Sequence, residues 1–455
     1  MDLHGKNVLV VGLGKSGVAS ALFLQARGAR VTVSDAKPQQ QLQDEIPALL
    51  EKGITVETGK HGERTFQNQD LIVVSPGVPT DLPQLAQARR AGTPVIGEIE
   101  LAARSLEGQI VAITGSNGKT TTTTLTGEVI AAGGCKTLVG GNIGTPAISF
   151  VGQSSTDTWV VLEISSFQLE TIETFRPHIS AILNLSPDHL DRHGSMANYV
   201  AAKARIFENQ RAGDFAVLNA DDEPTAALAS GLHPQVYWFS RKREVDRGAF
   251  VRDGQIIFRD EHGQRPIMSC GEITLKGAHN LENVLAAVAM GSLAGVEAAK
   301  IRTAVKDFKA VEHRLEYVAT IAGVDYYNDS KATNVDATIK ALEAFAGGIH
   351  IILGGKDKGS DYSVLSPLLR QRVRHVYTIG AAARKIESQI ENSVPITSSG
   401  TLGEAIRGAS ANARTGEIVL LAPACASFDQ FTSYEERGRV FKAEVRALQA
   451  DAGGR

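Results

Sequence analysis

The sequence predicts an α/β protein of three domains, each built on a mainly parallel β-sheet. Short apolar runs recur along the chain, and most of them end in a glycine or polar turn. Two of these turns have the form of phosphate-binding loops, and a chain of 455 residues is too long for one hydrophobic core. We therefore expect a Rossmann-like domain at residues 1–97, a central P-loop ATPase-type domain at 98–310 and a Rossmann-like C-terminal domain at 311–455.

The apolar runs give the expected strands, and a helical stretch from Val18 to Arg27 follows the first glycine turn. The strands are Val8–Val11, Val31–Val33 and Leu71–Val74 in the first domain, Ile110–Ile113, Trp159–Glu163, Ile179–Asn184 and Phe215–Leu218 in the second, and Ile349–Leu353, Val376–Ile379 and Ile418–Leu421 in the third. Strands that alternate with helices predict parallel sheets, whose carboxyl ends bind ligands.

Composition narrows the class of protein. Hydrophobic residues make up 43% and charged residues 21% of the chain, as in ordinary globular proteins. The net charge of −3 gives no reason to expect a nucleic acid or an anionic membrane as partner. Cys135, Cys270 and Cys425 are far apart, which supports neither a zinc site nor a disulfide framework. We expect a cytoplasmic protein with reduced thiols, no signal peptide and no membrane span.

The stretch from Ile110 to Thr124 has the layout of a phosphate-binding loop at the end of a strand. Gly115, Ser116, Asn117 and Gly118 form the turn, Lys119 supplies a mobile charge, Thr120 supplies a hydroxyl for Mg²⁺, and Thr121 continues into the helix. Ile113 stands where the usual pattern has a glycine, so the loop is a shorter form. The alternative is an ordinary strand-to-helix turn with a chance lysine. The favoured interpretation is a nucleoside triphosphate site.

A second glycine turn, Gly12–Gly17, lies in a βαβ unit whose second strand ends at Asp35. This is typical of dinucleotide-binding domains, in which the turn contacts a diphosphate and the acid binds a ribose or base. Glycines also serve tight helix–strand packing, so a purely structural turn is the alternative. The Ser75–Gly77 turn follows another strand and lies at the same edge of the predicted sheet.

Polar residues at the ends of the central strands are candidates for metal binding. Glu163 closes an apolar run, and such an acid commonly holds Mg²⁺ against a triphosphate; a solvated strand-end acid is the alternative. His189 lies in an Asp-His-Leu-Asp-Arg-His cluster after the next strand and is a candidate metal residue, or else a structural histidine. The residues around Lys203 predict only a helical surface lysine.

Together these motifs resemble the Mur ligases, which build the peptide of bacterial cell-wall precursors. The resemblance runs from Gly12 to about Arg439 and rests on an ordered set of motifs: Gly12–Gly17, Ser75–Pro79, Ile113–Thr121, Gly140–Gly144, Glu163–Gln168, Asn328–Asn334 and Pro423–Phe431. Folylpolyglutamate synthases share the central domain but lack a comparable N-terminal domain. The Asp-Asn-Pro-Arg motif of the diaminopimelate-adding branch is absent, and the set is most similar to the D-glutamate-adding branch.

The resemblance implies an ATP-dependent ligase that adds D-glutamate to UDP-N-acetylmuramoyl-L-alanine through an acyl phosphate. It implies that Lys119, Glu163, His189 and Lys203 act in catalysis. Thr120, Glu163, His189 and Lys203 would form the metal site, with two Mg²⁺ ions and a carbamylated Lys203. This reverses the interpretation of Lys203 as a surface residue. The expected partners are small molecules only, and the protein is expected to be a monomer.

Further residues are carried over by the same resemblance. Asn280, Asn283, Arg314 and Asp329 would join the phosphate loop in binding ATP, and Gly14, Lys15, Ser16, Asp35, Ser75, Gly77, Asn142, Ser165 and Gln168 would bind the UDP-sugar. Lys331, Thr333, Lys358, Ser427 and Tyr434 would bind D-glutamate. Tyr434 stands where phenylalanine is expected, and Lys356 competes with Lys358 for the side-chain carboxylate. Asp329, Lys331 and Ser427 have local capping as an alternative.

Two other classes of protein stay open on the sequence alone. An NAD-dependent dehydrogenase would use Gly12–Gly17 but leaves the second phosphate loop and the metal-binding acids unexplained. A non-catalytic nucleotide-binding or switch protein would need neither Glu163 nor His189, nor a third domain with polar strand ends. Direct measurement of nicotinamide binding separates the first of these from a ligase.

Overall fold

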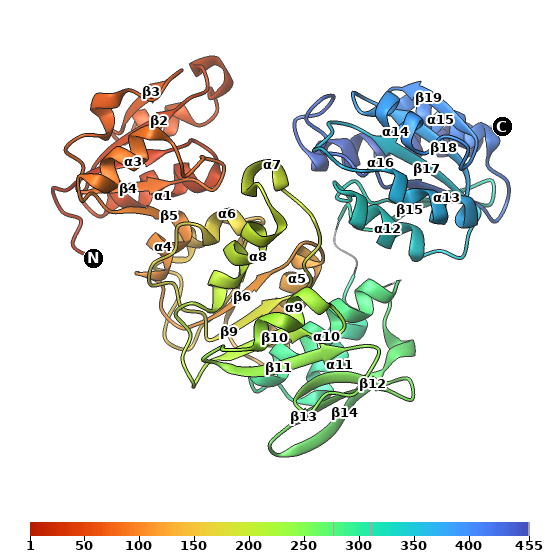
Figure 1. Cartoon of the computed structure of the whole chain (residues 1–455), viewed down its shortest axis with the longest axis horizontal. Coiled ribbons are helices and arrows are strands. Elements are labelled where there is room, and N and C mark those ends of the chain that lie inside the picture. Colours follow the sequence, from red (N-terminus) through yellow and green to blue (C-terminus); the bar gives the residue numbers. More distant parts are fainter. Residues whose placement is uncertain (276, 310–311, 454–455) are drawn as a thin grey trace. The chain divides into compact units, whose positions relative to one another are not determined.

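The chain folds into two compact units that carry three β-sheets between them (Figure 1). The computed structural model describes residues 1–275, 277–309 and 312–453. The first unit comprises Met1–Leu185, Ser195–Cys270 and Asn283–Val305, and the second comprises Ser186–Gly194, Gly271–Glu282 and Lys306–Arg455. The first unit contains the N-terminal and central sheets, and the second contains the C-terminal sheet.

The N-terminal sheet has five parallel strands in the order β3-β2-β1-β4-β5. Its strands are β1 (Asn7–Val11), β2 (Arg30–Asp35), β3 (Thr55–Thr58), β4 (Leu71–Val74) and β5 (Val95–Gly97). The three predicted strands are confirmed, and the predicted helix is α1 (Lys15–Ala26). The strand order reverses between β1 and β4, so the turns after these two strands meet at a topological switch point.

The central sheet has nine strands in the order β14-β13-β12-β11-β10-β9-β6-β8-β7. They are β6 (Gln109–Thr114), β7 (Thr137–Gly141), β8 (Trp159–Glu163), β9 (Ile179–Ile182), β10 (Phe215–Asn219), β11 (Gln235–Ser240), β12 (Gly248–Arg252), β13 (Gln255–Asp260) and β14 (Gly263–Ser269). The strands from β7 to β12 pair in parallel. The strands β13 and β14 add an antiparallel extension that the apolar runs of the sequence do not predict.

The C-terminal sheet has six strands in the order β15-β16-β20-β17-β18-β19. They are β15 (Glu316–Ile321), β16 (Val324–Asn328), β17 (Ile349–Gly354), β18 (Val373–Ile379), β19 (Ile396–Gly400) and β20 (Ile418–Leu421). The β15–β16 pair is antiparallel and the other pairs are parallel. The predicted strands of this region are confirmed. The central position of β20 places its carboxyl end beside those of β16 and β17.

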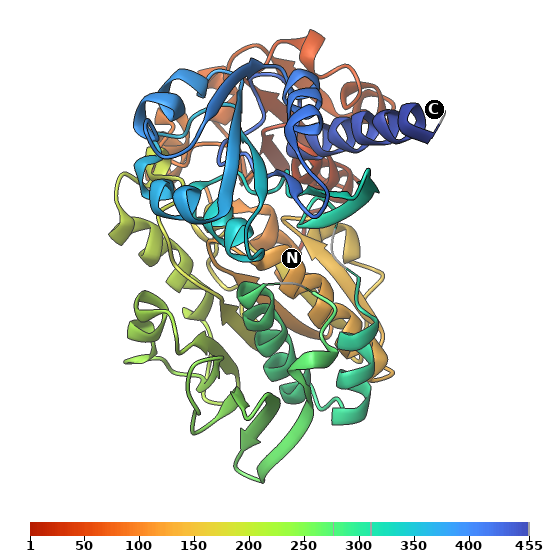
Figure 2. The same cartoon turned by 90° about the vertical axis from the view of Figure 1, so that its right-hand side faces the viewer.

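Helices connect the strands in all three parts. Those of the first unit are α2 (Ile46–Leu50), α3 (Pro83–Arg90), α4 (Glu98–Ala103), α5 (Lys119–Ala132), α6 (Ser166–Leu169), α8 (Met196–Ala204) and α9 (Glu223–Ala226). Those of the second unit are α7 (Leu190–His193), α12 (Val335–Glu343), α13 (Ser366–Arg372), α14 (Ala383–Gln389), α15 (Leu402–Asn412) and α16 (Tyr434–Gly453), and α10 (Ala278–Leu293) and α11 (Ala298–Asp307) extend across the division. Figure 2 shows α16 as a long helix ending near the C mark.

The hydrophobic core explains why the first two sheets form one unit. Buried residues of β1, such as Val8 and Val10, belong to the same cluster as Ile99 of α4 and Val160 of β8. The short 3₁₀ helix at Ala147–Phe150 packs against α4 within this cluster. Burial of these apolar strands favours formation of both sheets and determines where the carboxyl end of each strand lies within its sheet.

The predicted domain boundary at 97/98 falls between β5 and α4, and both lie in the first unit. The boundary at 310/311 lies outside the described residues. Both boundaries stay predictions. Of the helices that the structure describes, none combines the length and apolarity needed to cross a membrane.

Candidate functional site

The phosphate loop, residues 115–120, lies at the carboxyl end of β6, where β6 has β9 on one side and β8 on the other. Gly115 and Gly118 have φ angles of 147° and 86°, which favour glycine. A Cβ on Gly118 would lie 2.3 Å from Oδ1 of Asn283. The left-handed φ and this close approach therefore favour glycine at position 118. The loop leads directly into the N-terminus of α5, where an anion is favoured.

Side chains from two other elements hold the phosphate loop in shape. The backbone N–H of Asn117 donates to Oδ1 of Asn184 at 2.8 Å, and Nδ2 of Asn184 donates back to the carbonyl of Asn117 at 3.0 Å. Ser116 Oγ lies 3.0 Å from the hydroxyl of Tyr199 on α8. Neither Asn184 nor Tyr199 is among the site residues that the sequence motifs predict. For Asn184 a signal was present, because it ends the apolar run of β9.

Lys119 folds back over this loop. Its Nζ donates to the carbonyls of Gly115 at 2.9 Å and Ser116 at 3.0 Å. These carbonyls hold the ammonium group over the phosphate loop. The arrangement is that expected of a phosphate-binding lysine.

Thr120 and Glu163 meet at this edge of the sheet. Oγ1 of Thr120 donates to Oε2 of Glu163 at 2.7 Å, and Nδ2 of Asn142 donates to Oε1 at 2.9 Å. Glu163 is 2% exposed. The hydroxyl, the carboxylate and the amide carbonyl are hard oxygen ligands of the kind that Mg²⁺ prefers. The residues therefore fit a magnesium ion beside a phosphate loop.

Lys203 is buried, and its interpretation from the residues alone as a surface lysine is wrong. It lies on α8 with 2% exposure. Its Nζ donates to Oγ1 of Thr114 at 3.2 Å and to the carbonyl of Gly115 at 2.9 Å, and it lies 4.8 Å from the ring centre of Tyr199. The sequence around Lys203 does not reveal this burial, because it depends on contacts with Thr114 and Gly115, which are distant along the chain. Lys203 therefore lies against the phosphate loop.

His189 belongs to the second unit, whereas Lys119, Glu163 and Lys203 belong to the first. It precedes α7 with a left-handed φ of 52°, and its Nε2 lies 3.6 Å from Oδ2 of Asp188. Nδ2 of Asn334 donates to the same Asp188 oxygen at 3.2 Å. The loop that carries His189 is thereby joined to the start of α12.

The Gly12–Gly17 turn is shaped by close packing. A Cβ on Gly17 would lie 1.9 Å from the carbonyl oxygen of Gly12, and Oγ of Ser75 donates to that carbonyl at 2.8 Å. Oδ2 of Asp35 accepts from the N–H of Leu13 at 2.7 Å. Gly14 differs, because a Cβ there would meet nothing within 4 Å. The turn thus combines structural glycines with one open position.

The remaining predicted residues of this turn are accessible or lie at its edge. Lys15 is exposed and Ser16 is half-buried at the start of α1. Gly77 has open space around its Cβ position, in the turn where the N–H of Val78 donates to the carbonyl of Ser75. The structure therefore brings the turns after β1 and β4 together at the switch point, as the sequence predicts.

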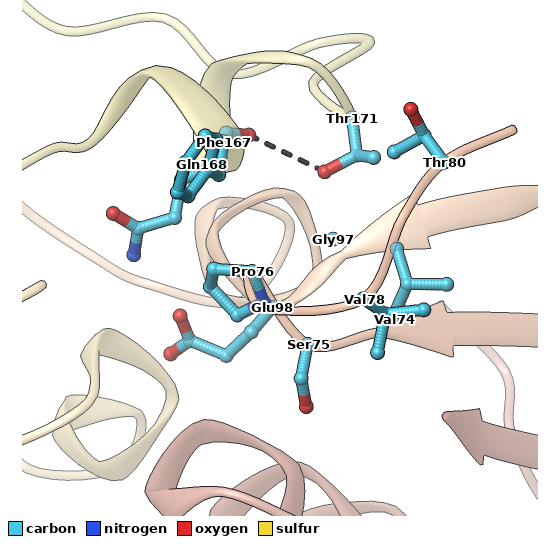
Figure 3. A pocket seen from close by; sticks show the side chains of 10 residues that line it. All are labelled: Val74, Ser75, Pro76, Val78, Thr80, Gly97, Glu98, Phe167, Gln168 and Thr171. Carbon is cyan, nitrogen blue, oxygen red and sulfur yellow. Dashed lines mark hydrogen bonds between the residues drawn. The ribbon is translucent and has the colours of Figure 1, made fainter. Parts of the chain in front are cut away.

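A small hollow lies beside the Ser75 turn, with residues of β4, the start of α4 and α6 around it (Figure 3). Ser165 and Gln168 form a capping box for α6, in which Ser165 Oγ accepts from the Gln168 N–H at 3.3 Å. Gln168 Nε2 and Glu98 Oε2 are both buried without a hydrogen-bond partner within the described part of the chain. Burial raises the pKa of Glu98 to about 7. Two predicted substrate residues thus have a structural role here.

Asn280 and Arg314 line one cavity of about 650 Å³ in the second unit, together with the side chains of Leu275, Tyr317 and Tyr327. Its aromatic walls suit a planar base, and the charged side chains of Lys306, Asp307 and Lys309 also line it. Asp329 is fully buried, and its Oδ1 lies 3.7 Å from Nη1 of Arg314. Burial raises the pKa of the Asp329 carboxyl. Asn283 belongs to the first unit, where its Oδ1 accepts from Oγ1 of Thr122 at 3.2 Å.

The segments that carry the predicted D-glutamate residues are joined at the ends of β16, β20 and β17. The N–H of Ala424 donates to the carbonyl of Ala332 between Lys331 and Thr333, and Lys356 pairs by its backbone with Ala426 beside Ser427. Lys331 Nζ donates to the hydroxyl of Tyr434 at 3.3 Å. The loops after these three strands are therefore held together at one edge of the C-terminal sheet.

The two candidate lysines of the β17 loop differ in their surroundings. Lys356 is exposed, whereas the side chain of Lys358 is 23% exposed and its Nζ lies 3.7 Å from Oδ1 of Asp188. Asp357, between them, pairs with Lys385 at 2.7 Å. The geometry favours Lys358 as the lysine that meets a carboxylate, but the choice between the two stays a prediction.

Comparison with known proteins places this geometry in a family. Residues 6–97 match the family described as Mur ligase MurD-like, N-terminal domain, residues 113–291 the Mur ligase middle domain, and residues 313–425 the Mur ligase, glutamate ligase domain. The chain belongs to the Mur ligase family. The resemblance recognised in the sequence motifs is confirmed, as is the three-domain α/β fold.

Individual relatives are similar over almost their whole length. The chain is 66% identical over 448 residues to the UDP-N-acetylmuramoylalanine--D-glutamate ligase of Koribacter versatilis, covering 98% of this chain and 99% of the relative. It is 60% identical over 454 residues to the protein of the same name from Acidobacterium capsulatum, covering 99% and 98%.

Solved structures share the fold. A pseudomurein peptide ligase type C from Methanothermus fervidus superposes with a TM-score of 0.63 and 19% identity, covering 98% of this chain and 100% of that chain. The UDP-N-acetylmuramate-alanine ligase MurC from Thermotoga maritima gives 0.61 and 19%, covering 97% and 99%.

Proposed function

We propose that this protein is an ATP-dependent ligase that joins D-glutamate to UDP-N-acetylmuramoyl-L-alanine. The observation that carries this proposal is the meeting of Lys119, Thr120 and Glu163 at one edge of the central sheet. These three side chains would bind the phosphates and the Mg²⁺ ion of ATP. The choice of D-glutamate is supported by the printed names of relatives that are 60% and 66% identical.

The reaction has two steps. A carboxylate is a poor electrophile, so an oxygen of the L-alanyl carboxylate first attacks the γ-phosphorus of ATP, and ADP leaves. The amine of D-glutamate then attacks the acyl phosphate through a tetrahedral intermediate. Phosphate leaves, the amine loses a proton, and an amide bond remains. Because the attacking and transferred groups are anionic, catalysis depends on positioning and on neutralising charge.

The chain supplies this positioning through the phosphate loop. The N–H groups of residues 115–120 and the ammonium of Lys119 hold the β- and γ-phosphates. Thr120 and Glu163 would hold Mg²⁺, which neutralises phosphate charge when bound. Asn142 fixes one carboxylate oxygen of Glu163, so the other stays directed toward Thr120.

We further propose a second Mg²⁺, held by His189 and Glu163, and a carbamate on Lys203. The carbamate is supported by the 2% exposure of Lys203 against the loop, because lysine is one of the residues least often found fully buried. Carbamylation replaces a cation with an anion. Lys203 would then offer oxygen atoms to the metal site.

The other carried-over residues divide by ligand. Gly14, Lys15, Ser16, Asp35, Ser75 and Gly77 would bind the uridine diphosphate, and Asn142, Ser165 and Gln168 the muramoyl-alanine part. Asn280, Asn283, Arg314 and Asp329 would bind ATP, and Lys331, Thr333, Lys358, Ser427 and Tyr434 D-glutamate. The cavity beside Asn280 and Arg314 supports a nucleotide base there. A cytoplasmic location and a monomeric state stay predictions.

The test is phosphate release from ATP with Mg²⁺ and bicarbonate, with UDP-N-acetylmuramoyl-L-alanine and D-glutamate supplied together and then each omitted. The proposal expects release only when both are present, and little with L-glutamate or lysine in place of D-glutamate. Release that prefers another amino acid would assign the protein to a different branch of the family. No release from the folded protein in any combination would refute ligase activity.

A further inference from the structure

We propose that Asp188 is an internal competitor for the carboxylate of the amino-acid substrate, held on Lys358 until that substrate binds. The inference rests on the proposed function, because it takes D-glutamate as the displacing ligand. Asp188 is not among the residues proposed above for catalysis, metal binding or substrate binding.

The contact is between a loop and the edge of the C-terminal sheet, within the second unit. Oδ1 of Asp188 lies 3.7 Å from Nζ of Lys358, and Oδ2 accepts from Nδ2 of Asn334 at 3.2 Å. The side chains of Asp188 and Lys358 are 11% and 23% exposed. A second hydrogen bond, from Ser186 Oγ to Asp336 Oδ2 at 3.1 Å, joins the same loop to α12.

The chemistry of the contact resembles that of the substrate. Asp188 presents a side-chain carboxylate to Lys358, and D-glutamate carries a side-chain carboxylate that needs a cationic partner. The pair lines a cavity of about 410 Å³, to which Val335 and Ile339 contribute apolar side chains and Asp336 and Asp361 contribute further carboxylates. This space suits an amino acid with an aliphatic stem and a charged end. The two carboxylates therefore compete for one ammonium group.

Displacement has a consequence for the neighbouring residue. Asp188 immediately precedes His189, which is the proposed metal residue of this loop. When D-glutamate takes Lys358, the ion pair between this loop and Lys358 is broken, whereas the hydrogen bonds that join the loop to Asn334 and Asp336 remain. Arrival of the amino acid thus changes the restraint on His189. A partly exposed ion pair is weak enough to be exchanged in this way.

The test compares the variants Asp188→Asn and Glu343→Gln in the complete reaction. Asparagine at 188 keeps the volume and an acceptor for Asn334 but removes the charge that holds Lys358. We expect its KM for D-glutamate to fall about two- to fivefold, the range of a partly exposed ion pair, with the KM for ATP unchanged. Glu343→Gln removes an exposed carboxylate on α12 that does not line this cavity, and it should leave the KM for D-glutamate unchanged.

Amide hydrogen exchange of residues 186–194 in the unmodified protein gives a second readout that does not depend on a variant's folding. With ADP and UDP-N-acetylmuramoyl-L-alanine already bound, added D-glutamate should speed exchange in this loop. An unchanged or higher KM in Asp188→Asn, an equal fall in both variants, or exchange that D-glutamate does not alter would each overturn the proposal. Absence of any turnover with D-glutamate in the unmodified protein would instead refute the proposed function.

Discussion

The hydroxyl of Thr120 donates a 2.7 Å hydrogen bond to the carboxylate of Glu163, although 43 positions separate the two residues. Parallel pairing of β6 with β8, with Ile113 opposite Glu163, brings them together. The start of α5 and the end of β8 thereby present oxygen ligands at one point beside the phosphate loop.

Glu163→Gln should lower phosphate release by at least about 100-fold, because it removes the anionic ligand proposed for Mg²⁺ while keeping the side chain's size. Release measured across a Mg²⁺ titration checks this, with the thermal midpoint as the folding control. Glu128→Gln, an exposed glutamate on α5, is the matched variant and should keep full activity. Activity retained by Glu163→Gln at ordinary Mg²⁺ would remove this residue from the metal site.

Carbamylation of Lys203 predicts a labelled carbonyl carbon after incubation with ¹³C-bicarbonate. The signal should persist after exchange into unlabelled buffer, because the residue is only 2% exposed, and it should vanish in Lys203→Arg. Carbon NMR measures both. A signal of equal size in Lys203→Arg would assign the carbamate to another amine, and no signal in the active protein would rule out a stable carbamate.

The glycine turn after β1 predicts opposite results for two similar substitutions. Gly17→Ala should lower the free energy of unfolding by about 1–3 kcal/mol, because the new Cβ would lie 1.9 Å from the carbonyl of Gly12. Gly14→Ala meets nothing within 4 Å and should leave stability unchanged, but it should weaken binding of the UDP-sugar by obstructing the approach of its diphosphate.

Denaturant unfolding and calorimetric titration with the UDP-sugar measure these two effects separately. If Gly14→Ala binds the UDP-sugar as tightly as the unmodified protein, the turn is purely structural and the diphosphate binds elsewhere.

Glu98 predicts a pH-dependent stability. Burial raises its folded-state pKa from 4.5 to about 7, so the folded state holds a proton that the unfolded state has released between these values. The stability of the unmodified protein should therefore fall as pH rises through this window, by at most about 3 kcal/mol. Glu98→Gln cannot ionise and should become progressively more stable than the unmodified protein from about pH 5 to about pH 8.

Glu100, two residues further along α4, is the control with the opposite sign. Burial raises its pKa, but hydrogen bonds from the Glu173 and Thr174 N–H groups, the Thr174 hydroxyl and Arg104 lower it more, and the net shift is downward. Its stabilising effect is present above its unfolded-state pKa and is lost as pH falls through the folded-state value. Glu100→Gln should thus be destabilising at neutral pH. Unfolding midpoints of Glu98→Gln and Glu100→Gln are measured at acid and neutral pH. If the two variants change in stability equally with pH, the opposite pKa shifts given to Glu98 and Glu100 are wrong.

Much of this architecture could be predicted from local sequence. Most strands of the three sheets are apolar runs with glycine or polar ends. The spacing of Gly115, Gly118 and Lys119 after such a run is typical of a phosphate-binding loop. Parallel pairing then brings Thr120 and Glu163 together without further information. These features depend on neighbouring residues and on one general rule of sheet topology.

Other features depend on contacts that sequence spacing does not reveal. Lys203 resembles a surface lysine because burial is decided by which side of α8 faces the phosphate loop. Gln168 and Ser165 form a capping box at the start of α6. The resemblance to the family predicts only that these two residues bind substrate. The antiparallel strands β13 and β14 pair across a tight turn. Their few apolar residues are mixed with polar ones, unlike the continuous apolar runs of the buried parallel strands.

The most direct test of the central claim is to follow ¹⁸O from the L-alanyl carboxylate of UDP-N-acetylmuramoyl-L-alanine during turnover with ATP and D-glutamate. Formation of an acyl phosphate predicts that each amide product is accompanied by one phosphate bearing a single ¹⁸O atom, detected by mass spectrometry. Product formed with unlabelled phosphate would contradict phosphorylation of the carboxylate. Labelled phosphate obtained equally well with L-glutamate would contradict the choice of D-glutamate.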